Sequence, residues 1–328
     1  MAEVATQTPR YIEAINAALS SEMAADDRVV LLGVDVAAAG GVYGVTRGLY
    51  DEFGPRRVID TPIAEAGVLG AAVGAAMAGL RPVAEIMYMD FLTVCLDPIV
   101  NQAAKLRYMT GGGVSVPIVF RTQTGAGRSA GAQHSQSLEG ILAHVPGLHV
   151  YCPSDARDAH DLLIEAIRLD TPVCFIENRR LYGKRSDEWD RTPLPAGQAR
   201  VVRSGEDVTV VTWGRMVLET LQALDQVGDE VSAELIDLRT LVPLDVETLI
   251  ASVQRTGRCL IVHEAVTRYG PGAELLARIA EAALFDLDGP IRRFGALPTP
   301  IPYSPELEAA AMPGVAGIAQ AVREVAKG

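Results

Sequence analysis

One carboxylate stands out in this sequence because of its surroundings. Glu65 is the single charge in the apolar run PIAEAGVLGAAVGAAMAGL, residues 62–80. On a helix it would share its face with Val68 and Leu69, which follow it by three and four residues. Such a carboxylate is either favoured by the positive end of the helix or held in a dry site for proton transfer. The sequence alone leaves both interpretations open.

One histidine also lies in a setting that favours chemistry. His134 belongs to the polar, glycine-rich segment GAQHSQS, which follows an expected buried strand at residues 117–121. Loops at strand ends carry functional sites disproportionately, and an imidazole there can present either ring nitrogen to a ligand. A purely structural role is as consistent with the pattern. The remaining histidines lack such a setting and are interpreted as structural.

Other catalytic patterns are weak or missing. Gly125-Ala126-Gly127 followed by Ala130 superficially matches a dinucleotide-binding fingerprint, but no acidic residue follows on a second strand. A nicotinamide-dependent dehydrogenase is therefore kept as an alternative. The sequence contains no GxxxxGK[ST] phosphate loop, no HExxH and no clustered Cys/His pattern, so it predicts no transition-metal site.

The element that must position Glu65 is a helix of small residues. Thr61 is suited to cap it, and Pro62 to occupy its first turn. Gly70 and Gly74 lie one turn apart, and glycines at this spacing allow another backbone to approach closely. We expect a buried helix in a crowded interface, with one acid at its tip.

Apolar runs of strand length alternate with helix-periodic segments along the chain, which predicts an α/β fold with mainly parallel sheets. The charged, proline-containing residues 179–199 break this alternation. We expect a first domain at residues 1–180, a linker at 181–200 and a second α/β domain at 201–328. The expected strands are residues 28–36, 57–60, 82–89, 117–121, 148–152, 173–176, 208–212, 233–238, 259–263 and 291–294. We expect a first helix that begins at Thr8-Pro9. Besides this helix and the glycine-rich one, the expected helices cover residues 97–109, 155–169, 216–226, 245–254 and 272–282.

Composition excludes several classes of partner. The formal net charge of −12 over 328 residues disfavours nucleic acid and anionic membranes. The longest uncharged apolar run, residues 66–80, is too short to span a bilayer. The N-terminal segment MAEVATQTPR has no signal pattern, and the four cysteines lack CxxC spacing. We therefore expect reduced thiols in a cytoplasmic protein.

Nine segments occur in a characteristic order: LLGVDV, GGVYGVTRGL, DTPIAEAG, AAVGAAMAGLRPVAEI, NQAAKLRYMTGG, GAQHSQS, PGL, LRTLVPLD and TPIPYSPELE. In this the sequence resembles, over nearly its whole length, the beta subunit of the thiamine-diphosphate-dependent, decarboxylating component of 2-oxo acid dehydrogenase complexes. That family covers pyruvate, branched-chain 2-oxo acid and acetoin dehydrogenases. The resemblance implies a pyrimidine-binding domain followed by a transketolase-like C-terminal domain.

The resemblance also implies roles for particular residues. Glu65 matches the acid that hydrogen-bonds N1′ of the cofactor's aminopyrimidine and so promotes removal of the thiazolium C2 proton. Phe91, which by itself is better interpreted as core packing, matches the aromatic that stacks on the pyrimidine. Met87 and Ile63 match positions that line the same pocket, and some members carry glutamine in place of Met87. His134 matches the loop histidine that faces the substrate and the acyl intermediate.

The metal sites implied by the resemblance depend on more than this chain. The GDG motif that binds Mg²⁺ in thiamine-diphosphate enzymes is missing, since the nearest match, Gly228-Asp229-Glu230, lies in a C-terminal turn. Mg²⁺ would therefore be held mainly by an alpha subunit, in an α2β2 assembly whose cofactor site lies between subunits. Some relatives bind a structural potassium ion through main-chain oxygens. The matching positions are Ile118, Ala166, Ile167, Leu169 and Thr171.

The implied activity is that of one subunit of an oxidoreductase. With an alpha subunit, this chain would decarboxylate a small 2-oxo acid oxidatively and pass the acyl group to the lipoyl groups of a dihydrolipoyl acyltransferase core. Cleavage of acetoin is the alternative within the family. A catalytically silent scaffold paralogue is a further alternative, against which the joint presence of Glu65, Phe91 and His134 argues.

Overall fold

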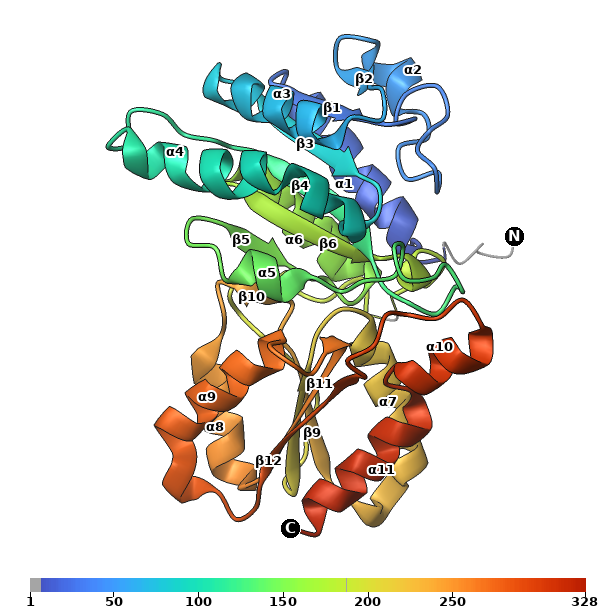
Figure 1. Ribbon diagram of the computed structural model, residues 1–328, viewed down its shortest axis with the longest axis vertical. Coiled ribbons are helices and arrows are strands. Elements are labelled where there is room, and N and C mark those ends of the chain that lie inside the picture. The colour runs from blue at the N-terminus through green and yellow to red at the C-terminus, as the bar shows by residue number, and fades with distance from the viewer. Residues whose placement is uncertain (1–6, 187) are drawn as a thin grey trace, which may run out of the picture.

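The computed structural model describes residues 7–186 and 188–328, and it contains two α/β domains, each organised around one sheet (Figure 1). The first sheet has the strand order β10-β5-β6-β4-β3-β1-β2 and the second β12-β11-β8-β9-β7. All neighbouring strands are parallel except the pairs β10–β5 and β7–β9. The expected α/β fold with mainly parallel sheets is confirmed. Residues 1–6, on which part of the signal-sequence prediction falls, lie outside the described residues.

The strands coincide closely with the apolar runs of the sequence. The first sheet contains β1 (Val29–Gly33), β2 (Val58–Asp60), β3 (Arg81–Ile86), β4 (Val119–Thr124), β5 (His149–Tyr151), β6 (Val173–Asn178) and β10 (Thr240–Val242). The second contains β7 (Arg200–Arg203), β8 (Val208–Thr212), β9 (Ala233–Asp237), β11 (Cys259–Val266) and β12 (Ile291–Ala296). Strands β7 and β10 are short, correspond to no predicted strand, and add antiparallel edges.

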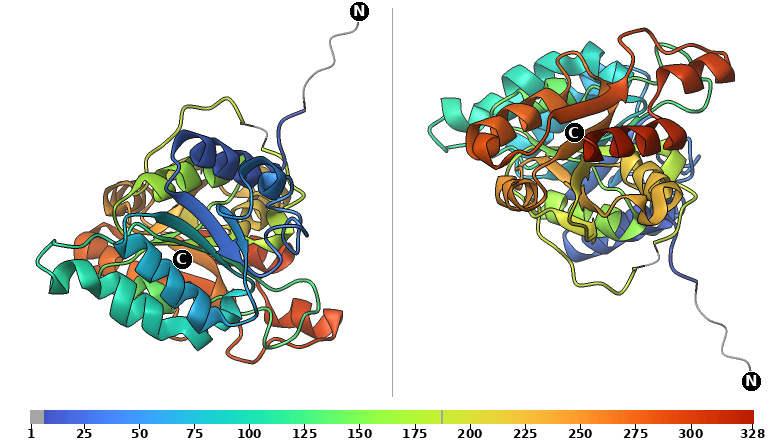
Figure 2. Two further views of the ribbon diagram at one scale, coloured as in Figure 1. Left: turned by 90° about the horizontal axis from the view of Figure 1, so that it is seen from above. Right: turned by 90° about the horizontal axis from the view of Figure 1, so that it is seen from below.

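Helices cover both faces of each sheet, which is why the central strands are apolar throughout (Figures 1 and 2). Seen from above, α3 and α4 lie on one side of the first sheet and α1 on the other (Figure 2). The helices are α1 (Tyr11–Ala25), α2 (Leu49–Phe53), α3 (Glu65–Met77), α4 (Ala104–Met109), α5 (Glu139–Ala143), α6 (Ala156–Arg168), α7 (Arg215–Val227), α8 (Val246–Thr256), α9 (Pro271–Ala283), α10 (Pro305–Ala311) and α11 (Val315–Ala326). Irregular helical segments are η1 (Met89–Cys95), the π-helix η2 (Pro98–Ala103), η3 (Arg179–Leu181), η4 (Gly228–Glu230) and η5 (Leu284–Asp286). Within the described residues, no helix is both long and apolar enough to cross a membrane.

Two predicted helix starts are wrong. The first helix begins at Tyr11 with Arg10 as N-cap, so Thr8-Pro9 does not open it. The glycine-rich helix begins at Glu65, and its N-cap residue Ala64 makes no side-chain bond. Thr61 lies four residues before Glu65, where its amide donates to the carbonyl of Gly33 at 2.9 Å and continues the path of β2 beside β1. Its hydroxyl has no hydrogen-bond partner among the described residues, so it does not cap the helix.

The register of the first sheet brings the predicted site residues to one edge. Gly33 of β1 pairs with Asp60 of β2 on one side and with Glu85 of β3 on the other, and β4 continues the same alignment beyond β3. The segments that follow β2, β3 and β4 therefore all leave the sheet at its carboxyl edge. These segments lead to Glu65, Phe91 and His134, at the edge where open α/β sheets bind ligands.

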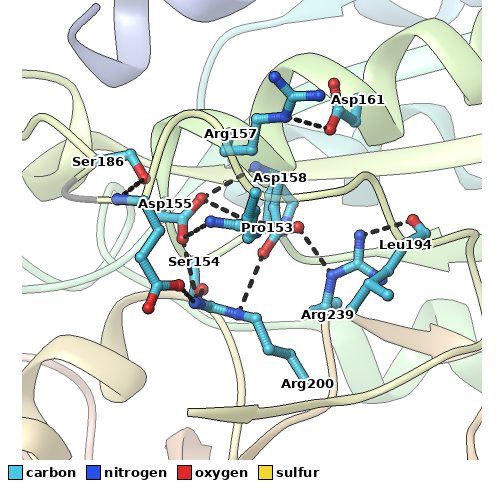
Figure 3. Close-up of polar contacts among 12 residues, drawn as sticks. Pro153, Ser154, Asp155, Arg157, Asp158, Asp161, Ser186, Leu194, Arg200 and Arg239 are labelled. Atoms are coloured by element: carbon cyan, nitrogen blue, oxygen red, sulfur yellow. Dashed lines mark hydrogen bonds and ion pairs between the residues drawn. The ribbon is translucent and has the colours of Figure 1, made fainter. Parts of the chain in front are cut away.

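The two domains are joined by buried ion pairs around the start of α6 (Figure 3). Asp155 caps α6 by accepting from the amide of Asp158, and its side chain also pairs with Arg200 at 3.0 Å. Arg239 follows β9 in the second domain and donates to Asp158 at 2.8 Å. Strand β10 also pairs with β5, so the second half of the chain completes the first sheet. These contacts fix the second domain against the edge of the first.

Candidate active site

Glu65 lies at the first position of α3 and is half-buried. Its carboxylate makes no hydrogen bond or ion pair with any residue in the described part of the chain. Burial and, secondarily, the charge of Glu65 raise the pKa of the Cys95 thiol to about 12. The carboxylate is therefore close to the buried wall formed by η1, yet it remains free to accept a proton or a hydrogen bond from a ligand.

The helix that carries Glu65 is buried by this chain on one face only. That face consists of Val68, Leu69, Ala72, Val73 and Ala76. The opposite face is exposed and contains Gly70 and Gly74, where an added Cβ atom would meet nothing within 4 Å. Burial of this helix is thus confirmed on one face, and among the described residues no backbone approaches the two glycines closely. An interface on the exposed face stays a prediction.

Phe91 is brought next to both other candidate residues. It lies in η1, packs against the core beneath α3 and accepts a hydrogen bond on its carbonyl from the Cys95 thiol at 3.4 Å. Its ring meets the His134 ring edge-on, with the centroids 5.4 Å apart. Phe91 therefore combines the core contact expected from the sequence with a place between the Glu65 helix and the loop of His134.

Tyr88 completes this aromatic cluster and was missed in the sequence. Its ring centroid lies 4.7 Å from that of His134, and the guanidinium carbon of Arg179 is 4.6 Å from the centre of the Tyr88 ring. A hydrogen bond with the Tyr43 hydroxyl at 3.0 Å is the first cause of the raised pKa of the Tyr88 phenol. Tyr88 is left-handed, with φ of 65°, which ends β3 three residues before the predicted end. Such strain in a bulky residue is typical of functional sites.

Arg179 was also missed, because the sequence analysis placed it in a charged, irregular segment. The structure buries it to 5% exposure in η3. Its Nη2 atom donates to the main-chain carbonyls of Gly125 and His134 and so closes the loop between them. The available signal was its position directly after β6, at the same carboxyl edge as the other site residues.

Met87 and Ile63, the other two residues predicted to line the cofactor pocket, lie outside the aromatic cluster. Met87 follows β3 and is half-buried, next to Tyr88. Ile63 precedes α3 and is 79% exposed. In this chain Ile63 is not brought into the aromatic cluster, so lining of a pocket by Ile63 would require a surface from outside the chain. Among the described residues there is no cluster of three His, Cys, Asp or Glu side chains that could hold a metal ion.

The predicted potassium ligands lie together, but an arginine already uses some of them. Nη1 of Arg81 donates to the carbonyls of Ile167 and Leu169, each at 3.0 Å, and to that of Arg168 at 3.2 Å. The carbonyl of Ile118 accepts from the amide of Val173 within the sheet. A potassium ion on this set would have to share oxygens with Arg81. The site at Ile118, Ala166, Ile167, Leu169 and Thr171 stays a prediction.

Glu139 is a buried carboxyl at the foot of the His134 loop. It begins α5, is 3% exposed and accepts a hydrogen bond from the Trp213 indole at 3.3 Å. Burial, together with the nearby charge of Glu264, raises the pKa of Glu139 to about 7. The folded chain therefore holds a proton here that the unfolded chain has already released above its ordinary pKa of 4.5.

This raised pKa predicts a pH-dependent stability. The contribution of Glu139 is fully present below about pH 4.5 and is lost as the pH rises through about 7. Burying the charged form at pH 8 costs about 3 kcal/mol, from the difference between these two pKa values. We expect Glu139→Gln to raise the urea midpoint relative to wild type at pH 8 and to leave it unchanged near pH 4.5. The exposed Glu281→Gln is the control, and an E139Q effect independent of pH would contradict the assignment.

Comparison with known families gives two matches in chain order. Residues 7–185 match the family described as transketolase, pyrimidine binding domain. Residues 197–318 match the family described as transketolase, C-terminal domain. Together they cover most of the described chain.

Curated relatives match the chain over nearly its full length. The beta subunit of acetoin:2,6-dichlorophenolindophenol oxidoreductase of Cupriavidus necator is 45% identical, covering 96% of each chain. The pyruvate dehydrogenase E1 component subunit beta of Rickettsia conorii is 45% identical, covering 95% of this chain and 97% of that protein. The corresponding mitochondrial subunit of Drosophila melanogaster is also 45% identical, covering 96% of this chain and 88% of that protein.

Solved structures support the fold. A split-gene transketolase, described as an inactive beta4 tetramer, superimposes with a TM-score of 0.79 at 22% identity, covering 97% of this chain and 98% of that one. A transketolase mutant from Pichia stipitis gives a TM-score of 0.69 at 14% identity, covering 98% of this chain and 46% of that one. At these identities the likeness concerns the fold alone.

Proposed function

This chain belongs to the family of beta subunits of thiamine-diphosphate-dependent 2-oxo acid dehydrogenases, and we propose that, paired with an alpha subunit, it catalyses the oxidative decarboxylation of a small 2-oxo acid. The proposal depends mainly on one observation, the carboxylate of Glu65 and its surroundings. Glu65 is a carboxylate without a partner in the described chain, on a helix with one open face, and its charge acts on the Cys95 thiol of η1.

The residues of the site fit thiamine diphosphate. An unpartnered acid at a helix start can accept a hydrogen bond from a protonated ring nitrogen, and Phe91 offers an aromatic surface beside it. When bound, thiamine diphosphate supplies a carbon nucleophile for the 2-oxo carbonyl and an electron sink for decarboxylation. Glu65 would hold the proton at the pyrimidine nitrogen, and His134 would orient the substrate from the opposite side of Phe91.

The site requires a second subunit in this proposal. Ile63 and the glycine face of α3 are exposed, and both lie next to Glu65. We assign them to contact with an alpha subunit in an α2β2 assembly, with the alpha subunit supplying the oxygen ligands of Mg²⁺ and the diphosphate contacts. The acyl group would then pass to lipoyl groups on an acyltransferase core. The net charge of −12 favours a basic docking segment on that core.

Calorimetric titration tests the division of the site between subunits. Thiamine diphosphate with Mg²⁺ is titrated into this chain alone and then into its assembly with the alpha subunit. We expect no measurable binding to the isolated chain and tight binding to the assembly. Tight binding and turnover by the isolated chain would contradict the shared site.

Acetoin is the second candidate substrate. It is favoured by the 45% identity to the beta subunit of an acetoin oxidoreductase over 96% of both chains. The two candidates are separated by assaying the same assembly with a panel of 2-oxo acids and with acetoin. A higher kcat/KM for acetoin than for every 2-oxo acid would select it.

The two alternatives from outside the family's activity are disfavoured by different observations. In the nicotinamide alternative, the amides of the GAG loop would bind phosphate, but those of Gly127 and Ser129 already donate to the carboxylate of Glu308. The scaffold alternative is disfavoured by the joint presence of Glu65, Phe91 and His134, of which Phe91 and His134 are in contact. The four cysteines are buried and free, and on this ground we propose a reducing compartment such as the cytoplasm.

A further inference from the structure

The loop that carries His134 is hydrogen-bonded to a residue of the second domain. We define the His134 loop as residues 125–137. The amide of Gly127 donates to Oε1 of Glu308 at 2.8 Å, and the amide of Ser129 donates to Oε2 at 2.9 Å. Glu308 belongs to α10 and is only 3% exposed. Figure 1 shows α10 at the upper right of the second domain, beside the green loop that follows β4.

The backbone of the loop is shaped to receive a carboxylate. Gly125, Gly127, Ser129 and Gly131 alternate along the loop, and all four have positive φ. Such alternation turns neighbouring N–H groups toward one side and forms a concave, anion-binding surface. A side chain of the same protein occupies this surface, because the buried carboxylate of Glu308 accepts from the amides of Gly127 and Ser129. Charge-assisted bonds of this kind are stronger than neutral ones.

A second contact between the two domains lies closer to His134. The ring of Tyr303, two residues before α10, packs closely on Gly131, whose φ is positive, and an added Cβ atom would displace the ring. The carbonyl of Gly131 in turn accepts from the amide of His134 at 3.3 Å. A third contact holds the start of the loop, because the amide of Ala126 donates to Glu264 at 2.9 Å.

We propose that Glu308 is a positioning residue for the reaction. By occupying the amides of Gly127 and Ser129, it holds the His134 loop so that the imidazole stays against Phe91 and Tyr88. The second domain thereby controls the geometry of the His134 loop through Glu308. This inference rests on the proposed function, because it assumes that His134 orients the substrate.

The test compares Glu308→Ala with Glu306→Ala in the assembled enzyme. Glu306 lies on the same helix but is exposed, and its carboxylate accepts from the Ser304 hydroxyl. We expect E308A to lower kcat about 100-fold, the scale of a misplaced reacting group, and E306A to leave it unchanged. The affinity for thiamine diphosphate should not change in E308A, because Glu65 and Phe91 lie on α3 and η1. Formate should restore part of kcat in E308A by occupying the vacated amides, whereas chloride at equal ionic strength should not.

A second measurement separates failure of this inference from failure of the proposed function. Amide hydrogen exchange at Gly127 and Ser129 is measured on the full chain without cofactor. Faster exchange in E308A than in E306A supports the contact, and unchanged exchange overturns it. Wild-type kcat in E308A overturns the positioning role. If the wild-type assembly neither binds cofactor nor turns over, the proposed function is contradicted instead. The exchange result then remains a test of the contact between Glu308 and the His134 loop.

Discussion

Replacing Glu65 with glutamine is expected to abolish most decarboxylation while the chain folds normally. General acid–base groups contribute about 100-fold to 10,000-fold to rates, and in the proposed function Glu65 holds a proton at the cofactor's ring nitrogen. A glutamine side chain keeps the size of glutamate but cannot share that proton. Since the Glu65 carboxylate has no partner among the described residues, its loss removes no native contact within the chain.

The measurement is kcat in the assembly with the alpha subunit, together with thermal unfolding of the variant. Glu247→Gln is the matched control, because Glu247 lies in the first turn of α8 and is exposed. We expect E247Q to match wild type in both measurements. Turnover of E65Q at the wild-type rate would remove Glu65 from the mechanism, whereas a large fall in the unfolding temperature would show that it has a structural role.

Replacing Arg121 with methionine is expected to destabilise the first domain strongly. Arg121 is fully buried in β4, donates through Nε and Nη2 to both oxygens of Glu177 and through Nη1 to Glu85 at 2.8 Å. Its removal would leave two buried carboxylates without a cation. Breaking a buried ion pair in this way costs about 3–5 kcal/mol, which is a large fraction of the stability of an ordinary domain.

The pH dependence of this loss identifies its cause. Burial already raises the pKa of Glu177, and the charge of Arg121 opposes that rise. Without Arg121 the folded-state pKa rises further, so the variant gains stability as falling pH protonates the carboxyl. Urea unfolding of R121M should therefore show a smaller deficit near pH 5 than near pH 8. The exposed pair of Arg278 and Glu274 supplies the control, Arg278→Met, for which we expect a loss of about 0.5 kcal/mol or less. An equal deficit at both pH values would point to lost packing instead of unpaired charge.

The sequence contained enough information to predict the fold class and most of the strands. The central strands are buried on both faces, so they are nearly continuous apolar runs, and the run predicted at residues 208–212 coincides with β8. The amphipathic α6 was equally accessible, since the helix predicted at residues 155–169 contains it. Glu65 could be singled out because charge is rare in an apolar helix, and the ordered motifs identified the family, which the matches over both domains confirm.

The site was only partly predictable, because several of its residues are defined by contacts between distant segments. Tyr88 looks like one more residue of a strand, and its left-handed conformation has no local signal. Arg179 lies in a charged stretch that resembles a linker until η3 turns it toward the His134 loop. The start of α3 was predicted at Thr61, a good cap by type, but the pairing of β2 with β1 extends through that residue.

The sequence by itself thus determined the periodic elements, the isolated acid and the order of motifs, since each depends on residues that are neighbours along the chain. The tertiary structure decided which charges are buried and what holds the His134 loop. Arg121 and Glu85 lie on different strands and become partners only when β3 and β4 pair. Glu308 meets Gly127 across 181 positions of sequence. Contacts of this kind arise from packing and from the need to satisfy buried polar groups, and no local pattern of residue types records them.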